Sequence, residues 1–203
     1  MAKLYFYYGV MGSSKTAQAL MCNYNYESKG LHPLLTKADY DTRDGLKTIK
    51  ARIGLEKACI TVSDLINVFE NADIGGRAEF EESSGYPYPD VIIIDEAQFM
   101  SPREVDFMSD LVDDLDIPVI CYGLKTDFKG ELFPGSERLL EIADKISEVK
   151  TTCWCGRKAI FNARYHGDQI IRDGEQLQLG GDNMYVALCR KHFKEGILTN
   201  PEV

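Results

Sequence analysis

LYFYYGVMGSSKT, residues 4–16, is the stretch of this 203-residue chain that decides its fold. Residues 4–8 form a short apolar run that predicts a buried strand. Residues 15–29 predict a helix, since apolar side chains recur there at helical spacing: Ala17, Leu20, Met21 and Tyr24. The glycine- and serine-rich loop between them ends in Lys-Thr, and this strand–loop–helix order is the context of a phosphate-binding P-loop.

The predicted P-loop consists of Gly9, Val10, Met11, Gly12, Ser13, Ser14, Lys15 and Thr16. Backbone N–H groups at a helix N-terminus favour phosphate, Lys15 would reach the β- and γ-oxygens of ATP, and Thr16 would bind Mg²⁺. Ser14 replaces the second glycine of the motif G-x-x-x-x-G-K-[ST]. Because serine carries a Cβ, we expect the loop to pass Ser14 without a glycine-only conformation. The alternative, a structural turn before a helix, does not explain why strand, loop, Lys-Thr and helix all agree.

Apolar runs and helical segments alternate over the first three quarters of the chain. Strands are predicted at 33–36, 58–62, 90–95 and 117–122, and helices at 63–69, from 101 onwards and at 136–142. Ser63-Asp64 is expected to cap the first of these helices, and Ser101, Pro102 and Glu104 have the pattern of a capping box at the second. The alternation predicts an α/β domain at 1–150, P-loop NTPase-like, with a mainly parallel sheet flanked by helices. The Gly- and Pro-containing segment 75–89 is predicted to be a mobile surface loop.

Two acids, Asp95 and Glu96, follow the β-branched run Val91–Ile94. Such a run is typical of a strand that is covered on both faces, and ligands of open α/β sheets bind at the carboxyl ends of strands. Asp95 would therefore face the P-loop Mg²⁺, and Glu96 would accept the proton of an attacking hydroxyl. Ala97 and Gln98 complete the motif and are counted with the nucleotide site. The alternative is an acidic loop after a core strand.

Four potential metal ligands lie in the C-terminal quarter: Cys153, Cys155, Cys189 and His192. Three thiolates and an imidazole match a closed tetrahedral zinc site, which has structural rather than catalytic chemistry. We therefore predict a small zinc-binding subdomain at 151–203. The alternative is a set of free cysteines in a small core. The other three cysteines are scattered, which favours free thiols and a reducing cytoplasm over a disulfide framework.

Composition excludes several classes of protein. Hydrophobic residues make up 44% and charged residues 27%, as in ordinary globular domains. The net charge of −9 disfavours a duplex DNA or RNA partner. We see no signal peptide and no apolar run long enough for a membrane span, so no membrane partner is expected.

At this point the sequence resembles one family, the tetrameric cellular-type thymidine kinases, from Leu4 to about Lys194. The segments that carry the resemblance are the P-loop, 95-DEAQF-99, 122-YGLKTDFKG-130, 153-CWCGRK-158 and 180-GGDNMY-185, which runs directly into Cys189 and His192. Their order and spacing together are specific. The resemblance implies transfer of the γ-phosphate of ATP to the 5′-hydroxyl of thymidine or deoxyuridine, giving dTMP and ADP for nucleotide salvage and DNA synthesis.

The resemblance also implies roles for single residues. Glu96 is similar to the family's catalytic base, and Asp41 and Arg43 resemble its D-x-R element beside the phosphates. The segment 165–185 resembles a lasso that closes over the nucleoside and is anchored by zinc. The apolar thymidine pocket would be formed by Met11, Phe99, Leu124, Phe128, Phe133 and Tyr185, and the alternative for Phe99, Phe128 and Phe133 is that they are core residues. A homotetramer and feedback inhibition by dTTP are further expectations.

Three other functions fit parts of the pattern. Asp95-Glu96-Ala97-Gln98 resembles the second motif of helicases, but a helicase needs a second motor domain and a basic path for the strand. A non-catalytic zinc-containing nucleotide sensor would not need Glu96 beside the phosphate. A kinase for a different deoxynucleoside, such as deoxyuridine, stays open, because one methyl group contributes only about 1–3 kcal/mol to discrimination.

Overall fold

A computed structural model describes residues 1–40, 45–176 and 185–199 of the chain. Its centre is a six-stranded sheet in the order β5-β2-β6-β7-β1-β8, and every pair of neighbouring strands is parallel. The strands are β1 (Leu4–Tyr8), β2 (Pro33–Lys37), β5 (Ile60–Thr61), β6 (Val91–Asp95), β7 (Val119–Gly123) and β8 (Lys145–Glu148). The predicted α/β class with a mainly parallel sheet is confirmed.

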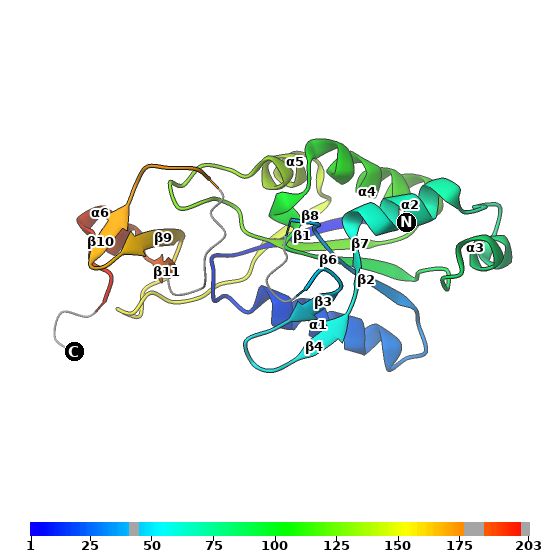
Figure 1. Cartoon of the computed structure of the whole chain (residues 1–203), viewed down its shortest axis with the longest axis horizontal. Coiled ribbons are helices and arrows are strands. Elements are labelled where there is room, and N and C mark those ends of the chain that lie inside the picture. The colour runs from blue at the N-terminus through cyan, green and yellow to red at the C-terminus, as the bar shows by residue number, and fades with distance from the viewer. Residues whose placement is uncertain (41–44, 177–184, 200–203) are drawn as a thin grey trace.

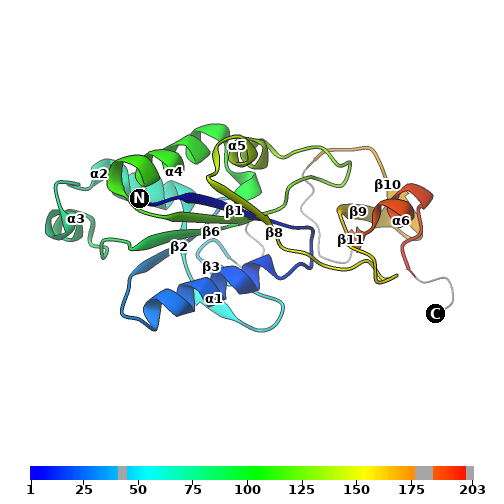
Figure 2. The same cartoon turned by 180° about the vertical axis from the view of Figure 1, so that it is seen from behind.

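Helices cover both faces of this sheet (Figures 1 and 2). One face carries α1 (Lys15–Glu27) and a hairpin of β3 (Thr48–Lys50) and β4 (Glu56–Ala58). The other face carries α2 (Val62–Asn71), α4 (Pro102–Leu115) and α5 (Pro134–Ile142). The short helix α3 (Arg77–Ser84) lies at one end of the molecule.

Strand β6 shows why its sequence has no polar alternation. Ile92 and Ile94 pack into the core under α2, α4 and α5, whereas Val91 and Ile93 pack into the core under α1. All four side chains are fully buried. Since successive side chains of a strand point to opposite faces, a sheet that is covered on both sides requires apolar residues at every position.

A second, smaller unit contains the C-terminal segments. Its antiparallel sheet has the order β10-β9-β11, formed by β9 (Phe161–His166), β10 (Gln169–Ile171) and β11 (Tyr185–Leu188), and α6 (Arg190–Glu195) follows. Its core is separate and includes Cys153, Leu188 and Phe193. The unit lies beyond the carboxyl ends of the parallel strands, at the opposite end of the molecule from α3 (Figure 1).

Two predictions on the α2–α3 region were wrong. The segment 75–89 is not wholly a loop, because it contains α3, whose Phe80 is fully buried against Phe69 and Tyr88. One buried aromatic side chain is too little periodicity to reveal a helix from sequence. The N-cap of α2 is Thr61 rather than Ser63-Asp64; its hydroxyl accepts the N–H of Asp64, whose carboxylate accepts the N–H of Thr61.

Other boundaries differ by smaller amounts. The helix predicted at 15–29 ends at Glu27, and the strand predicted at 58–62 is only Ile60–Thr61. The hairpin β3–β4 and the edge strand β8 were not predicted, since each is short and rich in charged residues. The capping box of α4 is confirmed, with Ser101 and Glu104 bonded reciprocally and Pro102 in the first turn. Among the helices described, none has the length and apolarity needed to cross a membrane.

Candidate active site

The loop after β1 begins at a close backbone approach. Gly9 donates its N–H to the carbonyl of Gly123, at 3.2 Å, at the end of the neighbouring strand β7. A Cβ at Gly9 would lie 2.4 Å from the carbonyl oxygen of Val149 and 2.5 Å from the Oγ of Ser13. Only glycine therefore fits where the chain leaves the sheet and turns towards α1.

Ser14 is the N-cap of α1 and has φ 64° and ψ 24°, in the left-handed region. The expectation that the loop avoids a glycine-type conformation here was wrong. The backbone keeps the conformation that glycine favours, and serine accepts it at a cost of about 1–2 kcal/mol. The Ser14 side chain is exposed, so no packing is lost by the replacement.

Lys15 is buried in the loop. Its Nζ donates to the carbonyl oxygens of Gly9, at 3.1 Å, and Val10, at 3.0 Å, and lies 3.4 Å from the Oγ of Ser13. These oxygens hold the ammonium group within the concave side of the loop. A phosphate chain in the loop would offer the ammonium group charged oxygen acceptors, which form stronger hydrogen bonds than carbonyls.

Asp95 ends β6, where it pairs in register with Lys37 of β2. Burial raises the pKa of Asp95 to about 7, and the charge of Glu96 acts in the same direction. A hydrogen bond with Thr16 and the positive charge of Lys15 favour the ionised form. The fold thus brings Asp95 into contact with Thr16, the P-loop residue predicted to bind magnesium.

Glu96 follows at the start of the short 3-10 helix η1 (Ala97–Phe99). It has φ 54° and ψ 37°, so a second non-glycine residue of the site is left-handed. Its Oε2 accepts a hydrogen bond from the side-chain amide of Gln98. The carboxyl group is half-buried at the carboxyl edge of the sheet, which is where a proton acceptor for a bound substrate would have to lie.

The predicted thymidine-pocket residues fall into two groups. Met11, Phe99, Leu124 and Tyr185 are half-buried, whereas Phe128 and Phe133 are almost fully buried. The ring of Phe99 packs edge-on against Phe133, with centroids 5.8 Å apart. Phe133 is also the N-cap of α5. Phe128 and Phe133 are thus core residues in this structure, which was the alternative to direct contact with the nucleoside. They support the wall of the site.

Phe128 is covered by Arg164 of β9, whose guanidinium carbon lies 3.8 Å from the ring centroid. The same guanidinium donates to the carbonyls of Asp173 and Glu175, both at 3.2 Å. Arg164 therefore joins the loop after β7 to residues 173–175, which belong to the predicted lasso. Residues 177–184 of that lasso, with Asp41 and Arg43, lie outside the described residues.

Sequence reasoning missed Asn162 of β9. Its Oδ1 accepts the backbone N–H of Met11, at 2.7 Å, and its Nδ2 donates to the carbonyl of Thr126, at 3.1 Å. The side chain is buried. One amide of the C-terminal unit thus connects the P-loop with the loop after β7. The polar residue at the second position of an otherwise unremarkable strand gave no signal in the sequence.

The four predicted metal ligands lie together. One donor atom from each of Cys153, Cys155, Cys189 and His192 falls within 4.8 Å of the others. The Sγ of Cys153 lies 3.4 Å from Nδ1 of His192, and the Sγ atoms of Cys155 and Cys189 are 3.9 Å apart. A tetrahedral zinc ion with bonds of about 2.3 Å to sulfur separates its ligands by about 3.8 Å. The donor set and its spacing therefore fit zinc.

The only tryptophan of the chain, Trp154, stacks on the imidazole of His192 with ring centroids 4.1 Å apart and planes at 3°.

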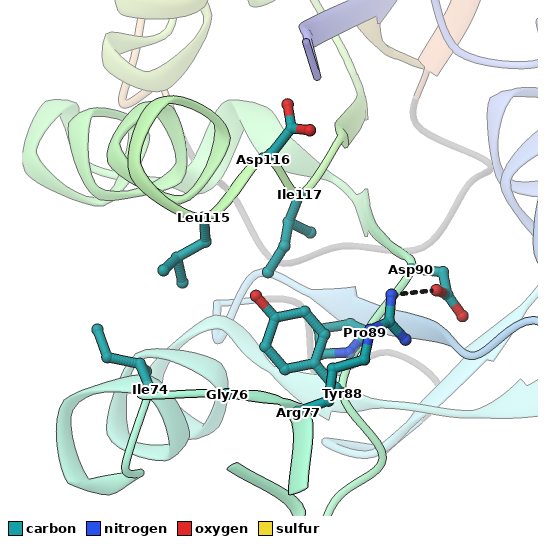
Figure 3. Close-up of a pocket in the computed structure, with 9 residues that line it drawn as sticks. All are labelled: Ile74, Gly76, Arg77, Tyr88, Pro89, Asp90, Leu115, Asp116 and Ile117. Carbon is teal, nitrogen blue, oxygen red and sulfur yellow. Dashed lines mark hydrogen bonds and ion pairs between the residues drawn. The ribbon is translucent and has the colours of Figure 1, made fainter. Parts of the chain in front are cut away.

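A cavity of about 380 Å³ lies elsewhere, near the amino-terminal ends of β6 and β7, and is lined by the ion pair Arg77–Asp90 and by Tyr88 (Figure 3). Because the strands are parallel, this cavity is at the opposite edge of the sheet from the P-loop and does not belong to the candidate site.

A parallel sheet with a P-loop, an acidic pair at its carboxyl edge and a Cys₃His cluster that could hold a structural metal are typical of a nucleotide-dependent phosphotransferase. The family model described as thymidine kinase matches residues 2–193. The chain belongs to the thymidine kinase family.

Individual relatives agree with this assignment. The chain is 44% identical to a thymidine kinase of Rhodopirellula baltica, over 100% of this chain and 92% of that protein. It is 42% identical to the thymidine kinase of Shewanella oneidensis, over 97% and 99% of the two chains, and 42% identical to that of Escherichia coli K12, over 97% and 93%. A solved DNA replication initiation factor covers 73% of this chain at 15% identity and a TM-score of 0.40, a similarity that supports no conclusion.

Proposed function

We propose that the protein transfers the γ-phosphate of ATP to the 5′-hydroxyl of thymidine, giving dTMP and ADP for nucleotide salvage. The observation that carries the proposal is the contact of Thr16 with Asp95, which places the acidic pair against the P-loop in a chain of the thymidine kinase family. Phosphoryl transfer depends mainly on positioning and charge neutralisation, and both motifs supply these at one edge of the sheet.

In this proposal the P-loop holds the triphosphate. The N–H groups of residues 9–16 and the N-terminus of α1 surround the phosphates, and Lys15 exchanges its carbonyl acceptors for phosphate oxygens. The D-x-R residues Asp41 and Arg43 would lie beside the same phosphates by family resemblance. Ala97 and Gln98 belong to the nucleotide motif by resemblance as well.

The residues present fit a magnesium ion. Mg²⁺ prefers hard oxygen ligands, and the hydroxyl of Thr16 and the carboxylate of Asp95 lie next to each other. Burial of Asp95 disfavours its charge, and a divalent cation would offset that cost. When bound, the ion would neutralise the charge that develops on the transferred phosphate.

Glu96 acts as the catalytic base in this proposal. It accepts the proton of the 5′-hydroxyl as the oxygen attacks the γ-phosphorus and the bond to the β,γ-bridging oxygen of ATP breaks. Met11, Phe99, Leu124 and Tyr185 would contact the nucleoside, and Phe128 and Phe133 would support them. The lasso at 165–185 would close over the base.

Three further features rest on family resemblance. Zinc held by the Cys₃His cluster would anchor the lasso, dTTP would inhibit as end product, and the chain would assemble as a homotetramer. A reducing cytoplasm would keep the three thiolates available for the metal. Sedimentation of the purified protein, with and without dTTP, tests the assembly directly.

The deciding experiment measures phosphate transfer from Mg-ATP to a panel of nucleosides by the wild-type protein and by Glu96→Gln. We expect transfer to thymidine, and a loss of about 10²–10⁴-fold in kcat in the variant with ATP binding retained, because general-base catalysis contributes that much. Glu70→Gln makes the same chemical change at an exposed position of α2 and should leave kcat unchanged.

Each alternative function predicts a different result. Normal turnover in Glu96→Gln would remove Glu96 from the role of base. Faster transfer to deoxyuridine than to thymidine would reassign the substrate. Tight ATP binding without transfer to any nucleoside would favour the sensor, and ATP hydrolysis stimulated by single-stranded DNA would favour the nucleic-acid-dependent ATPase.

A further inference from the structure

We propose that Gln98 is a positioning residue, whose side-chain amide holds the carboxylate of Glu96 and the peptide of Leu124 in fixed relation. The inference rests on the proposed function, since it concerns the base of that reaction and a wall of its nucleoside pocket. It assigns Gln98 a task other than contact with the nucleotide.

The amide of Gln98 lies between the two groups. Its Oε1 accepts the N–H of Leu124 at 2.9 Å, and its Nε2 donates to Oε2 of Glu96. The side chain is 1% exposed. An amide that meets a donor at one end and an acceptor at the other has only one favourable orientation, because a flip would set oxygen against oxygen and nitrogen against nitrogen.

The peptide of Leu124 is itself held from its other side. The hydroxyl of Ser136, in the first turn of α5, donates to the carbonyl of Leu124 at 2.5 Å. The N–H of Leu124 is held by Gln98, so both polar groups of this residue have partners. The end of β7 and α5 therefore fix the position of the Gln98 side chain. Its hydrogen bond to Glu96 restricts the carboxylate in turn.

Close packing explains why β7 ends in glycine. A Cβ at Gly123 would lie 2.8 Å from Oε1 of Gln98 and 3.0 Å from its backbone nitrogen. Any larger residue would push Gln98 away from Leu124 and Glu96. The approach of β7 to η1 is therefore built around this one side chain.

The backbone conformation of Glu96 explains why its carboxylate needs a hydrogen bond that holds it in place. Its left-handed backbone, at φ 54°, is strained for a non-glycine residue and persists only when surrounding contacts hold it in place. A base on a strained turn with a free side chain would sample many positions, and a displacement of about 1 Å can cost about 10²-fold in rate. The hydrogen bond from Gln98 restricts the positions that the carboxylate can take.

Two variants separate the donor function of Gln98 from its acceptor function. Gln98→Glu keeps an oxygen for the N–H of Leu124 but loses the donor to Glu96 and sets a like charge against it. Gln98→Met is similar in volume and loses both bonds. We expect kcat for thymidine phosphorylation to fall about 10- to 100-fold in both, with the KM for ATP within a factor of about two of wild type. The matched control is Asn67→Asp, the same amide-to-carboxylate change at an exposed position of α2.

Thermal unfolding and ATP binding show whether each variant folds. If Gln98 only holds the loop at Leu124, Gln98→Glu keeps wild-type kcat while Gln98→Met does not, and the proposal is overturned. Wild-type kcat in both variants overturns it as well. A wild-type protein that phosphorylates no nucleoside contradicts the proposed function and the role of Gln98 together. If the wild type is active, the activities of the two variants test the role of Gln98 alone.

Discussion

Backbone conformation singles out two residues of the site. Among the residues that the structure describes, the non-glycine residues with positive φ are Ser14, Glu96 and Asp116, and the first two lie in the P-loop and beside Asp95. Asp116 ends α4, a common place for such a conformation. Strained residues gather at functional sites because surrounding contacts hold them there. Positive φ at Ser14 and Glu96 therefore supports a functional role for the carboxyl edge of the sheet.

At the residue scale we predict a stability order at position 14. Ser14→Gly should raise the free energy of unfolding by up to about 1 kcal/mol, because glycine adopts the left-handed conformation without strain. The gain is limited because glycine also has more conformational entropy in the unfolded chain. Ser14→Val should lower it by about 1–2 kcal/mol, because a β-branched residue fits this conformation poorly. Urea unfolding of the three proteins measures the order.

The exposed side chain of Ser14 makes the comparison clean, because neither replacement changes core packing. A valine variant as stable as the wild type would show that the loop does not hold the left-handed conformation in solution. Ser14→Gly should also retain ATP binding, since the phosphate contacts come from backbone N–H groups.

At the scale of elements, β9 of the C-terminal unit reaches into the P-loop. Asn162 holds the N–H of Met11 and the carbonyl of Thr126, two groups from different loops of the parallel sheet. Arg164, two residues further along the strand, covers Phe128. Residues i and i+2 of a strand share a face, so one face of β9 contacts the loops that would surround the predicted nucleoside pocket.

We predict that Asn162→Leu frees the P-loop amide. One hydrogen bond contributes about 0.5–1.5 kcal/mol to the stability of the closed state, and the variant loses it. Hydrogen exchange at the Met11 N–H should therefore accelerate by up to about tenfold. Asn162→Asp keeps the oxygen that accepts this N–H and should leave the exchange rate of Met11 closer to wild type. NMR or mass spectrometry of the exchanged amides provides the measurement.

The Gly9 N–H, which donates to the carbonyl of Gly123 where the chain leaves the parallel sheet, serves as the internal reference. Its exchange should not change in either variant. Equal acceleration at Gly9 and Met11 would indicate a general loss of stability rather than the loss of a specific contact.

At the scale of the whole molecule, two units with separate cores face each other at the carboxyl edge of the sheet. The P-loop and the acidic pair belong to the first unit, and the metal cluster belongs to the second. Metal loss should therefore affect the two substrates unequally. In the proposed site the nucleoside pocket includes Met11 and Phe128, both contacted by β9, whereas Lys15 and Asp95 would serve the triphosphate.

We predict that zinc removal, by a chelator or by Cys153→Ser, raises the KM for thymidine more than the KM for ATP. Trp154 reports the event, because it stacks on His192 and is the only tryptophan of the chain. Its fluorescence should change with metal content, and Trp154→Phe should lose the signal while it keeps the metal. An unchanged affinity for thymidine in the zinc-free protein would contradict the proposed anchoring of the lasso.

Much of the molecule was accessible from sequence. The P-loop, the buried run at 91–94, the capping box at Ser101 and the Cys₃His spacing are local patterns, and local patterns have local physical causes: phosphate needs N–H groups at a helix start, and a doubly covered strand needs apolar residues throughout. These patterns determined the α/β class, the candidate metal ligands and the resemblance to thymidine kinases.

Only the tertiary structure decided the contacts that cross the chain. The left-handed turn at Ser14, the hydrogen bonds of Gln98 to Leu124 and Glu96, and the link from Asn162 to Met11 depend on which strands lie side by side. α3 is similar, because Phe80 is held by Phe69 and Tyr88 and not by a periodic pattern. A hydrogen bond between residues far apart in sequence leaves no spacing to read, so the sequence by itself identified the chemistry of the site, and packing decided how its groups are held.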